Sequence, residues 1–486
     1  MSRLIQAIPE GFTFAAAARK SKRHDIMNPQ IERNGTSSVN PATGETFAFH
    51  PFVPDGDLRE LLADSHTRFV AWRATPLAER LEILRRFADG LRTERDALAR
   101  EATLEMGKTI ASAGGEIDKC AAVIDWYVER APQLLADRPV PVPSGKAHLA
   151  YEPLGVVLGV MPWNFPYWQI LRAAVPITTG GNFFLVKPAE NTMGCGALLQ
   201  KLAEKTGFSR AFAVANLTKE QCATALADTR IVGVSVTGSV RAGQALAQLA
   251  GRNIKKSVLE LGGADPFIVL ADADLDVTVK AAVSSRFSNC GQVCIAAKRI
   301  IVEDSVRDRF TRDFVAAVKD LEPLDPMDEG CFIGPMARID LRDTLHRQVE
   351  HALSEGATLL AGGFPLNRPG AWYQPTVLGN ITQGMTPFTD ELFGPVASII
   401  SARNADHAIE LANDSRYGLC ASLWTRDEDQ ATRLARRIEA GGVFINRISA
   451  SDPHLPIGGI KESGFGRELT EWGLYEFMNV KTVWHA

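Results

Sequence analysis

The pattern of hydrophobic and polar residues changes character several times along the chain. Between residues 57 and 108, leucines and other large apolar residues recur every three or four positions, which predicts amphipathic helices. A further helix is expected over residues 116–135. The proline-rich run 139–143 cannot be helical and predicts an edge or crossing strand, and residues 147–151 continue as extended chain.

Short apolar runs alternate with helical segments from residue 155 to residue 261. The pattern predicts strands at residues 155–161, 182–186, 211–217, 231–236 and 257–261, and helices at 193–206, 219–228 and 240–250. This alternation is typical of a parallel sheet that is covered by helices on both faces. In such sheets a ligand lies outside the carboxyl ends of the strands.

A second α/β segment is expected from about residue 266 to residue 446. Its strands are predicted near residues 297–302, 396–401, 419–424 and 441–446. The last residues, 479–484, alternate as a strand does but have no partner nearby in the sequence. A strand with an unpaired edge often completes the sheet of another subunit, and we expect that role here.

Composition narrows the class of protein. A chain of 486 residues is long enough for two or three domains, and 45% hydrophobic with 23% charged residues is typical of a globular enzyme. The net charge of −4 favours neither a nucleic acid nor an anionic membrane as partner, and no apolar run reaches the roughly 18 residues of a membrane span. The seven cysteines lack metal-ligand spacing, so we expect reduced thiols, no metal site and a cytoplasmic location.

Residues 1–37 differ from the rest of the chain. Their basic run, 19–24, follows the apolar run 12–18, which is the wrong order for a secretory signal. We expect a mobile or partly docked N-terminal extension.

A thiol and a carboxylate are the first candidates for chemistry. Cys294 ends the glycine-containing run 287–294, and Glu260 follows the apolar run 257–259. A thiol that forms an acyl intermediate needs a base that later activates water, so the two residues fit a two-step reaction. Considered alone, however, a buried cysteine is more often a small apolar core residue.

Asn164 and the pair Glu391 and Phe393 lie next to predicted strands. The Asn164 amide is a donor of the kind that holds an oxyanion, but in isolation a turn asparagine that bonds its own backbone is the more frequent case. Glu391 and Phe393 precede a strand, and alone they indicate only a turn.

Two further strand ends are candidates for binding a nucleotide. Lys187 and Glu190 can bind ribose hydroxyls between them, although a solvated loop pair is the default. Gly238 and Ser239 open a helix after a strand, which suits a phosphate at the helix N-terminus or, equally, a serine N-cap. The spacing is not that of the usual dinucleotide-binding glycine motif.

These segments, together and in this order, resemble the aldehyde dehydrogenase superfamily over about residues 39–484. The resemblance includes the runs at residues 40–45 and 456–468. It implies an α/β fold with a Rossmann-like cofactor domain, an α/β catalytic domain and a small β oligomerisation element. The implied division is an N-terminal extension at 1–37, a cofactor-binding domain at 38–133 and 152–262, a catalytic domain at 263–462, and an oligomerisation element at 134–151 and 463–486.

The resemblance also implies a role for each candidate residue. Cys294 is the nucleophile, Asn164 and the Cys294 backbone N–H hold the oxyanion, and Glu260 activates the water that hydrolyses the thioester. NAD is the expected cofactor and NADP the alternative, because the Glu190 carboxylate would repel the 2′-phosphate of NADP. The implied cofactor contacts are Trp163, Lys187, Pro188, Glu190, Gly238, Ser239, Leu261, Glu391 and Phe393.

Within the superfamily the chain looks most like the bacterial succinate-semialdehyde dehydrogenases. Arg172 matches a residue that contacts the substrate carboxylate, and a guanidinium fork suits that group, although a surface or interface arginine is the alternative. Ser451 lies in the loop that supplies a substrate-contacting serine. Ser288 stands where some of those enzymes carry a second carboxylate-binding arginine.

The expected activity is NAD(P)-dependent oxidation of a short semialdehyde, with succinate semialdehyde as the best candidate and succinate as the product. The alternatives are a general aliphatic, lactaldehyde or aromatic aldehyde dehydrogenase, and a cofactor-binding structural protein without turnover. The expected partners are the small-molecule aldehyde and further copies of the chain, in a homodimer or homotetramer.

Overall fold

The computed structural model describes residues 31–32 and 34–486. The predicted N-terminal extension lies largely outside these residues, but its last part forms strand β2 (Gly35–Val39). This strand lies in a three-stranded antiparallel sheet between β1 (Ile31–Glu32) and β3 (Thr46–Pro51). A strand here was not predicted from the hydrophobic pattern.

The predicted helices between residues 57 and 135 are confirmed. They are α1 (Leu58–Ala74), α2 (Leu77–Thr93), α3 (Arg95–Met106) and α4 (Ile110–Leu134). The apolar residues of α2 recur at helical spacing and are buried on one face, against α4 and α6. The spacing predicted these helices because each has one buried and one exposed side.

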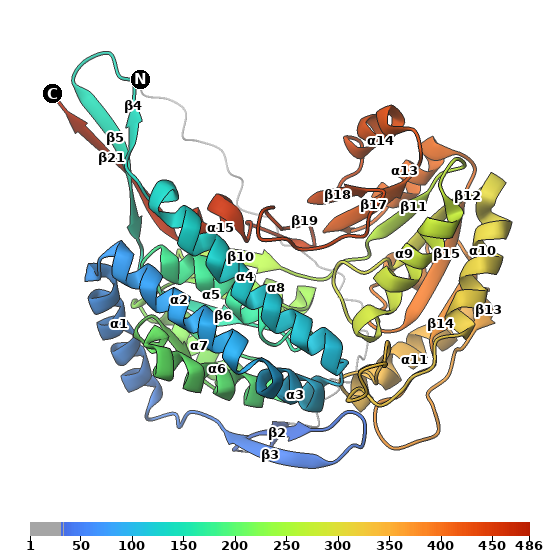
Figure 1. Ribbon diagram of the computed structural model, residues 1–486, viewed down its shortest axis with the longest axis horizontal. Helices are drawn as coiled ribbons and strands as arrows, with labels where there is room; N and C mark the ends of the chain where they lie inside the picture. Colours follow the sequence, from blue (N-terminus) through green and yellow to red (C-terminus); the bar gives the residue numbers. More distant parts are fainter. Residues whose placement is uncertain (1–30, 33) are drawn as a thin grey trace, which may run out of the picture.

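A six-stranded sheet forms the centre of the first half of the chain (Figure 1). In order across the sheet, its strands are β20 (Gly464–Phe465), β10 (Lys256–Glu260), β9 (Ile231–Thr237), β6 (Val156–Val160), β7 (Phe183–Lys187) and β8 (Phe212–Val214). All neighbours are parallel except β20, which pairs antiparallel with β10. The order of the parallel strands reverses between β6 and β9, which is where open α/β sheets bind ligands.

Helices cover both faces of this sheet, as predicted. They are α5 (Trp168–Thr179), α6 (Met193–Thr206), α7 (Lys219–Ala227) and α8 (Val240–Arg252), with the short 3₁₀ turns η1 (Glu190–Thr192) and η2 (Phe208–Arg210). Helix α5 was not predicted. Every one of its residues is buried, so it lacks the polar face that marks an amphipathic helix.

A seven-stranded sheet forms the centre of the second half of the chain. In order across the sheet, its strands are β13 (Thr358–Ala361), β14 (Thr376–Ile381), β15 (Val396–Ala402), β12 (Arg299–Glu303), β11 (Pro266–Val269), β17 (Cys420–Trp424) and β18 (Gly442–Ile445). Only β13 is antiparallel to its neighbour. The helices of this half are α9 (Leu275–Phe287), α10 (Asp304–Lys319), α11 (Ile339–Ser354), α12 (Thr386–Thr389), α13 (Ala405–Asn413) and α14 (Glu428–Ala435).

The C-terminal strand corrects one expectation. Strand β21 (Met478–His485) pairs antiparallel with β5 (Lys146–Pro153) of the same chain, and β5 also pairs with β4 (Arg138–Val140). As predicted, β21 has no partner nearby in the sequence, because its partner lies more than 300 residues earlier (Trp484 Nε1 donates to Ser144 O over a separation of 340 residues). One edge of β21 is therefore paired within the chain, which the sequence analysis did not foresee. This three-stranded sheet projects from the rest of the molecule in Figure 1.

The candidate residues lie where strand ends of the first sheet contact loops that precede strands of the second sheet. Asn164 follows the carboxyl end of β6, Gly238 follows that of β9, and Glu260 is the last residue of β10. Cys294 and Gly394 instead precede the amino ends of β12 and β15. The smaller elements β16 (Tyr417–Gly418), β19 (Ile460–Lys461) and α15 (Thr470–Tyr475) complete the fold. None of the helices in the described part of the chain is both long and apolar enough to cross a membrane.

Candidate active site

The segment that carries Cys294 begins in a tight, left-handed turn. Helix α9 ends at Phe287, and the 3₁₀ turn η3 (Ser288–Gly291) follows. Asn289, Cys290 and Gly291 have φ values of 54°, 55° and 69°, a region that residues other than glycine rarely adopt. We call residues 288–298 the thiol loop. Its backbone is held in a costly conformation, so surrounding contacts must stabilise it.

Arg286 supplies several of those contacts. Its guanidinium is fully buried and donates to the carbonyl oxygens of Gly291 (3.3 Å), Leu392 (3.0 Å) and Gly394. The arginine therefore joins the thiol loop to the turn that carries Glu391 and Phe393. Burial lowers the pKa of Arg286 to about 10, which leaves it charged at neutral pH.

Asn164 both donates a hydrogen bond to the thiol loop and accepts one from it. Its Nδ2 donates to the backbone oxygen of Gln292 (3.0 Å), and Asn289 Nδ2 donates to the backbone oxygen of Asn164 (2.9 Å). A primary amide has two N–H groups, so one remains for a further acceptor. The buried Oδ1 of Asn164 has no hydrogen-bond partner among the described residues. The structure thus brings Asn164 and the Cys294 segment together, as the sequence predicted.

The Cys294 side chain is half-buried and close to two cations. Burial raises the pKa of Cys294 to about 11, and the charges of Lys298 and Arg172 oppose this rise. Lys298 Nζ also donates to the backbone oxygens of Val293 (2.8 Å) and Cys294. The thiol therefore rests protonated at neutral pH, in a field that stabilises its anion.

Glu260 is a buried carboxyl group facing the same site. Burial raises the pKa of Glu260 to about 8, and the Arg172 cation opposes the rise. Its Oε1 is buried and has no hydrogen-bond partner within the described chain. Three residues later, a Cβ added to Gly263 would lie 2.9 Å from the backbone oxygen of Cys294. The Glu260 segment therefore packs directly on the thiol loop.

Arg172 lies in α5 with its side chain fully buried. It forms an ion pair with Glu468, and its NH2 group donates to Thr237 Oγ1 at 3.5 Å. The positive charge acts on the pKa of both Cys294 and Glu260, so the guanidinium lies within electrostatic reach of the two. Its role as a substrate contact stays a prediction, and the Glu468 carboxylate already balances its charge.

The predicted ribose residues form two separate ion pairs. Lys187 Nζ lies 2.6 Å from Glu190 Oε1. Burial would raise the pKa of Glu190, but the Lys187 ammonium outweighs it and holds the pKa below its usual value. Glu391 is 3.1 Å from Lys298 and accepts from the Gly263 N–H at 3.1 Å.

Two aromatic rings pack against each other next to Lys298. The rings of Trp163 and Phe393 meet edge to face, with centroids 5.6 Å apart. The Lys298 ammonium lies 5.8 Å from the Phe393 ring centroid. Two residues that lie far apart in the sequence, each predicted to contact a cofactor, are therefore neighbours.

The N-terminus of α8 is open enough for a phosphate. Ser239 caps the helix, with its Oγ accepting from the Ala242 N–H at 3.3 Å. A Cβ added to Gly238 would meet nothing within 4 Å. An anion can therefore approach the free N–H groups of this helix end. Pro188 and Leu261 are buried and pack against Gly196 and Gly243, and their contact with a cofactor stays a prediction.

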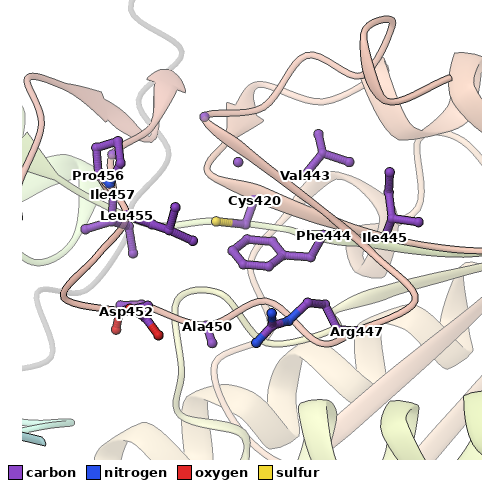
Figure 2. Close-up of a pocket in the computed structure, with 14 residues that line it drawn as sticks. Cys420, Val443, Phe444, Ile445, Arg447, Ala450, Asp452, Leu455, Pro456 and Ile457 are labelled. Carbon is purple, nitrogen blue, oxygen red and sulfur yellow. The ribbon is translucent and has the colours of Figure 1, made fainter. Parts of the chain in front are cut away.

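A pocket of about 320 Å³ lies along β17, β18 and the loop after β18 (Figure 2). Its lining comes from β17, β18 and the loop that follows β18, and includes Cys420, Phe444, Arg447 and Ser451. Burial raises the pKa of Cys420, and the charges of Asp265, Cys294 and Glu260 raise it further, so this wall is close to the thiol. The lining is largely apolar, which suits a short carbon chain.

Several residues of the site were missed in the sequence. Lys298, Glu468 and Lys119 each contact a predicted site residue, and Arg286 donates to the backbone on either side of Phe393. Lys298 could have been noticed, because a lysine directly before an apolar strand is seldom buried without a partner. The other three lie in ordinary helical or loop sequence, and only the fold brings them to the site.

Known proteins are similar to this chain over nearly its whole length. The model of the aldehyde dehydrogenase family matches residues 28–483. The chain is 49% identical to the succinate semialdehyde dehydrogenase [NAD(P)+] Sad of Escherichia coli over 92% of this chain and 97% of the relative. It is 44% identical to the succinate-semialdehyde dehydrogenase [NADP(+)] 1 of Mycobacterium bovis, over 93% and 99%.

A solved structure gives the same result for the fold. The succinic semialdehyde dehydrogenase of Streptococcus pyogenes, in complex with NADP+, superposes with a TM-score of 0.91 at 36% identity, over 92% of this chain and 99% of that one. The α/β fold with a Rossmann-like sheet is thereby confirmed. The chain belongs to the aldehyde dehydrogenase family.

Proposed function

We propose that the protein oxidises succinate semialdehyde to succinate, with NAD as the cofactor and NADP as the alternative. The observation that carries this proposal is the 49% identity to the Escherichia coli succinate semialdehyde dehydrogenase over 448 residues. The arrangement of Cys294, Asn164 and Glu260 around one space supports the reaction type.

Cys294 is the nucleophile in this proposal. Its sulfur attacks the aldehyde carbon as the thiolate and forms a thiohemiacetal. Lys298 and Arg172 favour the anion because they oppose the pKa rise that burial causes. The free N–H of the Asn164 amide and the Cys294 backbone N–H stabilise the oxyanion of the adduct.

The residues around the helix α8 N-terminus fit a nicotinamide dinucleotide. Gly238 leaves space for a phosphate there, Lys187 and Glu190 offer polar groups to one ribose, and Glu391 offers a carboxylate to the other. When bound, the dinucleotide supplies an acceptor for the hydride that leaves the aldehyde carbon. Trp163 and Phe393 wall off this space with their packed rings.

Glu260 completes the reaction. The thioester on Cys294 is hydrolysed by water, and a carboxylate base makes that water a better nucleophile. With a pKa of about 8, the Glu260 carboxylate is a stronger base than a solvated one, and part of it is deprotonated at neutral pH. Hydrolysis to the free acid is therefore the proposed outcome.

The test compares a charged with an uncharged substrate. We expect kcat/KM for succinate semialdehyde to exceed that for butanal by at least about tenfold with NAD, since a bound carboxylate contributes roughly 1.5–3 kcal/mol. Equal rates with the two aldehydes would make the enzyme a general aldehyde dehydrogenase. Normal NAD binding without any turnover would instead indicate a structural protein.

Two further proposals concern the whole protein. We propose that it acts in the cytoplasm, in keeping with its reduced cysteines. We also propose a homodimer or homotetramer. The exposed strand β21 supports this assembly, because its outer edge has no partner strand in the described chain.

A further inference from the structure

An ammonium group that forms no ion pair within the described residues lies beside the pocket that Ser451 helps to line. Lys119 projects from α4, and its Nζ donates to Ser451 Oγ at 2.6 Å. Ser451 belongs to the pocket lining, so the ammonium is one side chain away from the pocket. The same ammonium lies 4.2 Å from the centroid of the Trp168 ring.

Trp168 fixes where this ammonium lies relative to the thiol loop. It is the first residue of α5, four positions after Asn164. Glu116, one turn before Lys119 on α4, accepts the backbone N–H groups of Tyr167 and Trp168, each at 2.8 Å. The helix that carries Lys119 is therefore bonded to the start of the helix that follows Asn164, and the position of Lys119 is fixed by backbone contacts.

The neighbouring carboxylates already have partners. Glu116 forms an ion pair with Lys108, and Glu468 with Arg172. Asp452, next to Ser451, accepts from both the backbone N–H (2.9 Å) and the ring (2.8 Å) of His454. Within the described residues Lys119 itself forms no ion pair, and its contacts are a hydroxyl and an aromatic face. A half-buried ammonium in this state is suited to an anionic ligand.

We infer that Lys119 binds the carboxylate of the semialdehyde substrate, with Ser451 as a second donor, and so sets the preference for acid-tailed aldehydes. This inference rests on the proposed function and names the residue that binds the substrate carboxylate. Lys119 is suited to this task better than Arg172, because Glu468 forms an ion pair with Arg172, whereas Lys119 has no ion-pair partner among the residues that the structure describes.

Because of the charges around Lys119, the inference predicts that the preference for the semialdehyde depends on pH. Burial and the Arg172 cation on α5 lower the pKa of Lys119 to about 8, while Cys120 and Glu116 on α4 and Asp452 in the loop act in the opposite direction. The ammonium is charged at neutral pH and loses its proton as the pH rises above about 8. The ratio of kcat/KM for succinate semialdehyde to that for butanal should fall over this range. Titration of Glu260 affects both substrates and cancels in the ratio.

The main test replaces the ammonium and keeps the side chain's length. In Lys119→Met we expect kcat/KM for succinate semialdehyde to fall about 10- to 100-fold, mainly through KM, as for a lost charge-assisted hydrogen bond. The ratio to butanal should fall by the same factor and lose its pH dependence. Lys119→Arg should restore most of the preference, and Lys319→Met, at the exposed end of α10, should behave as the wild type.

The outcomes separate this inference from the proposed function. If the wild type does not prefer the semialdehyde, the proposed function fails and the inference fails with it. If the wild type has the preference and Lys119→Met keeps it, the inference alone is wrong. Loss of the preference in Arg447→Met instead, at the exposed arginine of the pocket lining, would assign the carboxylate to that residue. An equal loss with both substrates in Lys119→Met would show a structural role and also overturn the inference.

Discussion

Cys294 and Glu260 are both held mainly in their protonated forms at neutral pH. Burial raises the pKa of the thiol to about 11 and that of the carboxyl group to about 8. The same shielding from water strengthens the attraction between any developing negative charge and the nearby Lys298 and Arg172. The site therefore keeps Cys294 and Glu260 largely uncharged at rest, but it stabilises negative charge that develops during a reaction.

Replacement of Glu260 by glutamine should separate the two halves of the reaction. Steady-state turnover is expected to fall about 10²- to 10⁴-fold, because the proposed general base is lost. A burst of about one reduced cofactor per site should remain in stopped-flow absorbance, since attack by Cys294 does not need the base. Wild-type turnover in this variant would contradict the assignment.

The pH dependence of the wild-type reaction rates should also test the role proposed for Glu260. The pKa of Glu260 is raised, so the active carboxylate forms as the pH rises through about 8, and the deacylation rate should rise with it. In Glu260→Gln this rise should disappear, while a rise from the Cys294 thiol remains at higher pH. Pre-steady-state rates between pH 6 and 10 would measure both.

Glu190 should control the choice between NAD and NADP. Its pKa is lowered by Lys187, so its carboxylate stays charged at neutral pH and opposes a 2′-phosphate there. Glu190→Gln should raise the ratio of kcat/KM for NADP to that for NAD about tenfold, as the loss of a roughly 1–2 kcal/mol repulsion implies. Glu204→Gln, on the exposed face of α6, is the matched control. An unchanged ratio would remove Glu190 from cofactor selection.

At the residue scale the sequence suggested candidate catalytic residues but not the side chains that support them. Cys294, Glu260 and Asn164 were proposed because motifs in a fixed order resemble a family. The side chains that hold them could not be found in the same way. Arg286 donates to backbone carbonyl oxygens. Every residue has such an oxygen, so the residue types around it do not reveal the contact.

The thiol loop is the element most sensitive to backbone change. Gly291 has a φ of 69°, and a Cβ added there would overlap the carbonyl of Gly394. Gly291→Ala should lower the free energy of unfolding by about 1–3 kcal/mol and reduce kcat more than tenfold, because the loop must shift. Urea unfolding and steady-state kinetics would measure the two effects.

Gly115 provides the matched control for this substitution. It lies on the exposed face of α4, where an added Cβ meets nothing within 4 Å. Gly115→Ala should stabilise the protein by about 0.5–1 kcal/mol and leave kcat unchanged. If Gly291→Ala behaved like this control, the left-handed turn would have no role in positioning Cys294.

At the element scale most of the parallel strands were predicted, because each is a short apolar run between helices, but β11 and β14 were missed. The failures have physical causes. Helix α5 is buried on every side and shows no polar face. Strand β2 is buried although its residues, Gly35–Val39, are mostly small and polar, so its burial depends on neighbours far along the chain. Pairing between distant segments, such as β5 with β21, cannot be deduced from local periodicity.

The whole molecule is expected to assemble through the outer edge of the sheet β21–β5–β4. Val480 and Trp484 on β21 are 49% and 59% exposed. Light scattering should give two or four times the 52.8 kDa of one chain, and Val480→Glu should shift the protein toward the monomer. Val277→Glu, at a comparably exposed valine of α9, should not. A monomeric wild type would refute the proposed assembly.

The C-terminal segment closes three separate parts of the fold. Strand β20 completes the six-stranded sheet beside Glu260, Glu468 pairs with Arg172, and β21 joins β5. These residues are synthesised after every one of their partners. The nascent chain must therefore keep an incomplete sheet edge and an unpaired buried arginine until residues 464–485 have emerged. A nonsense mutation before Gly464 would leave that state permanent, so it should yield aggregated or degraded protein rather than a slightly shortened enzyme.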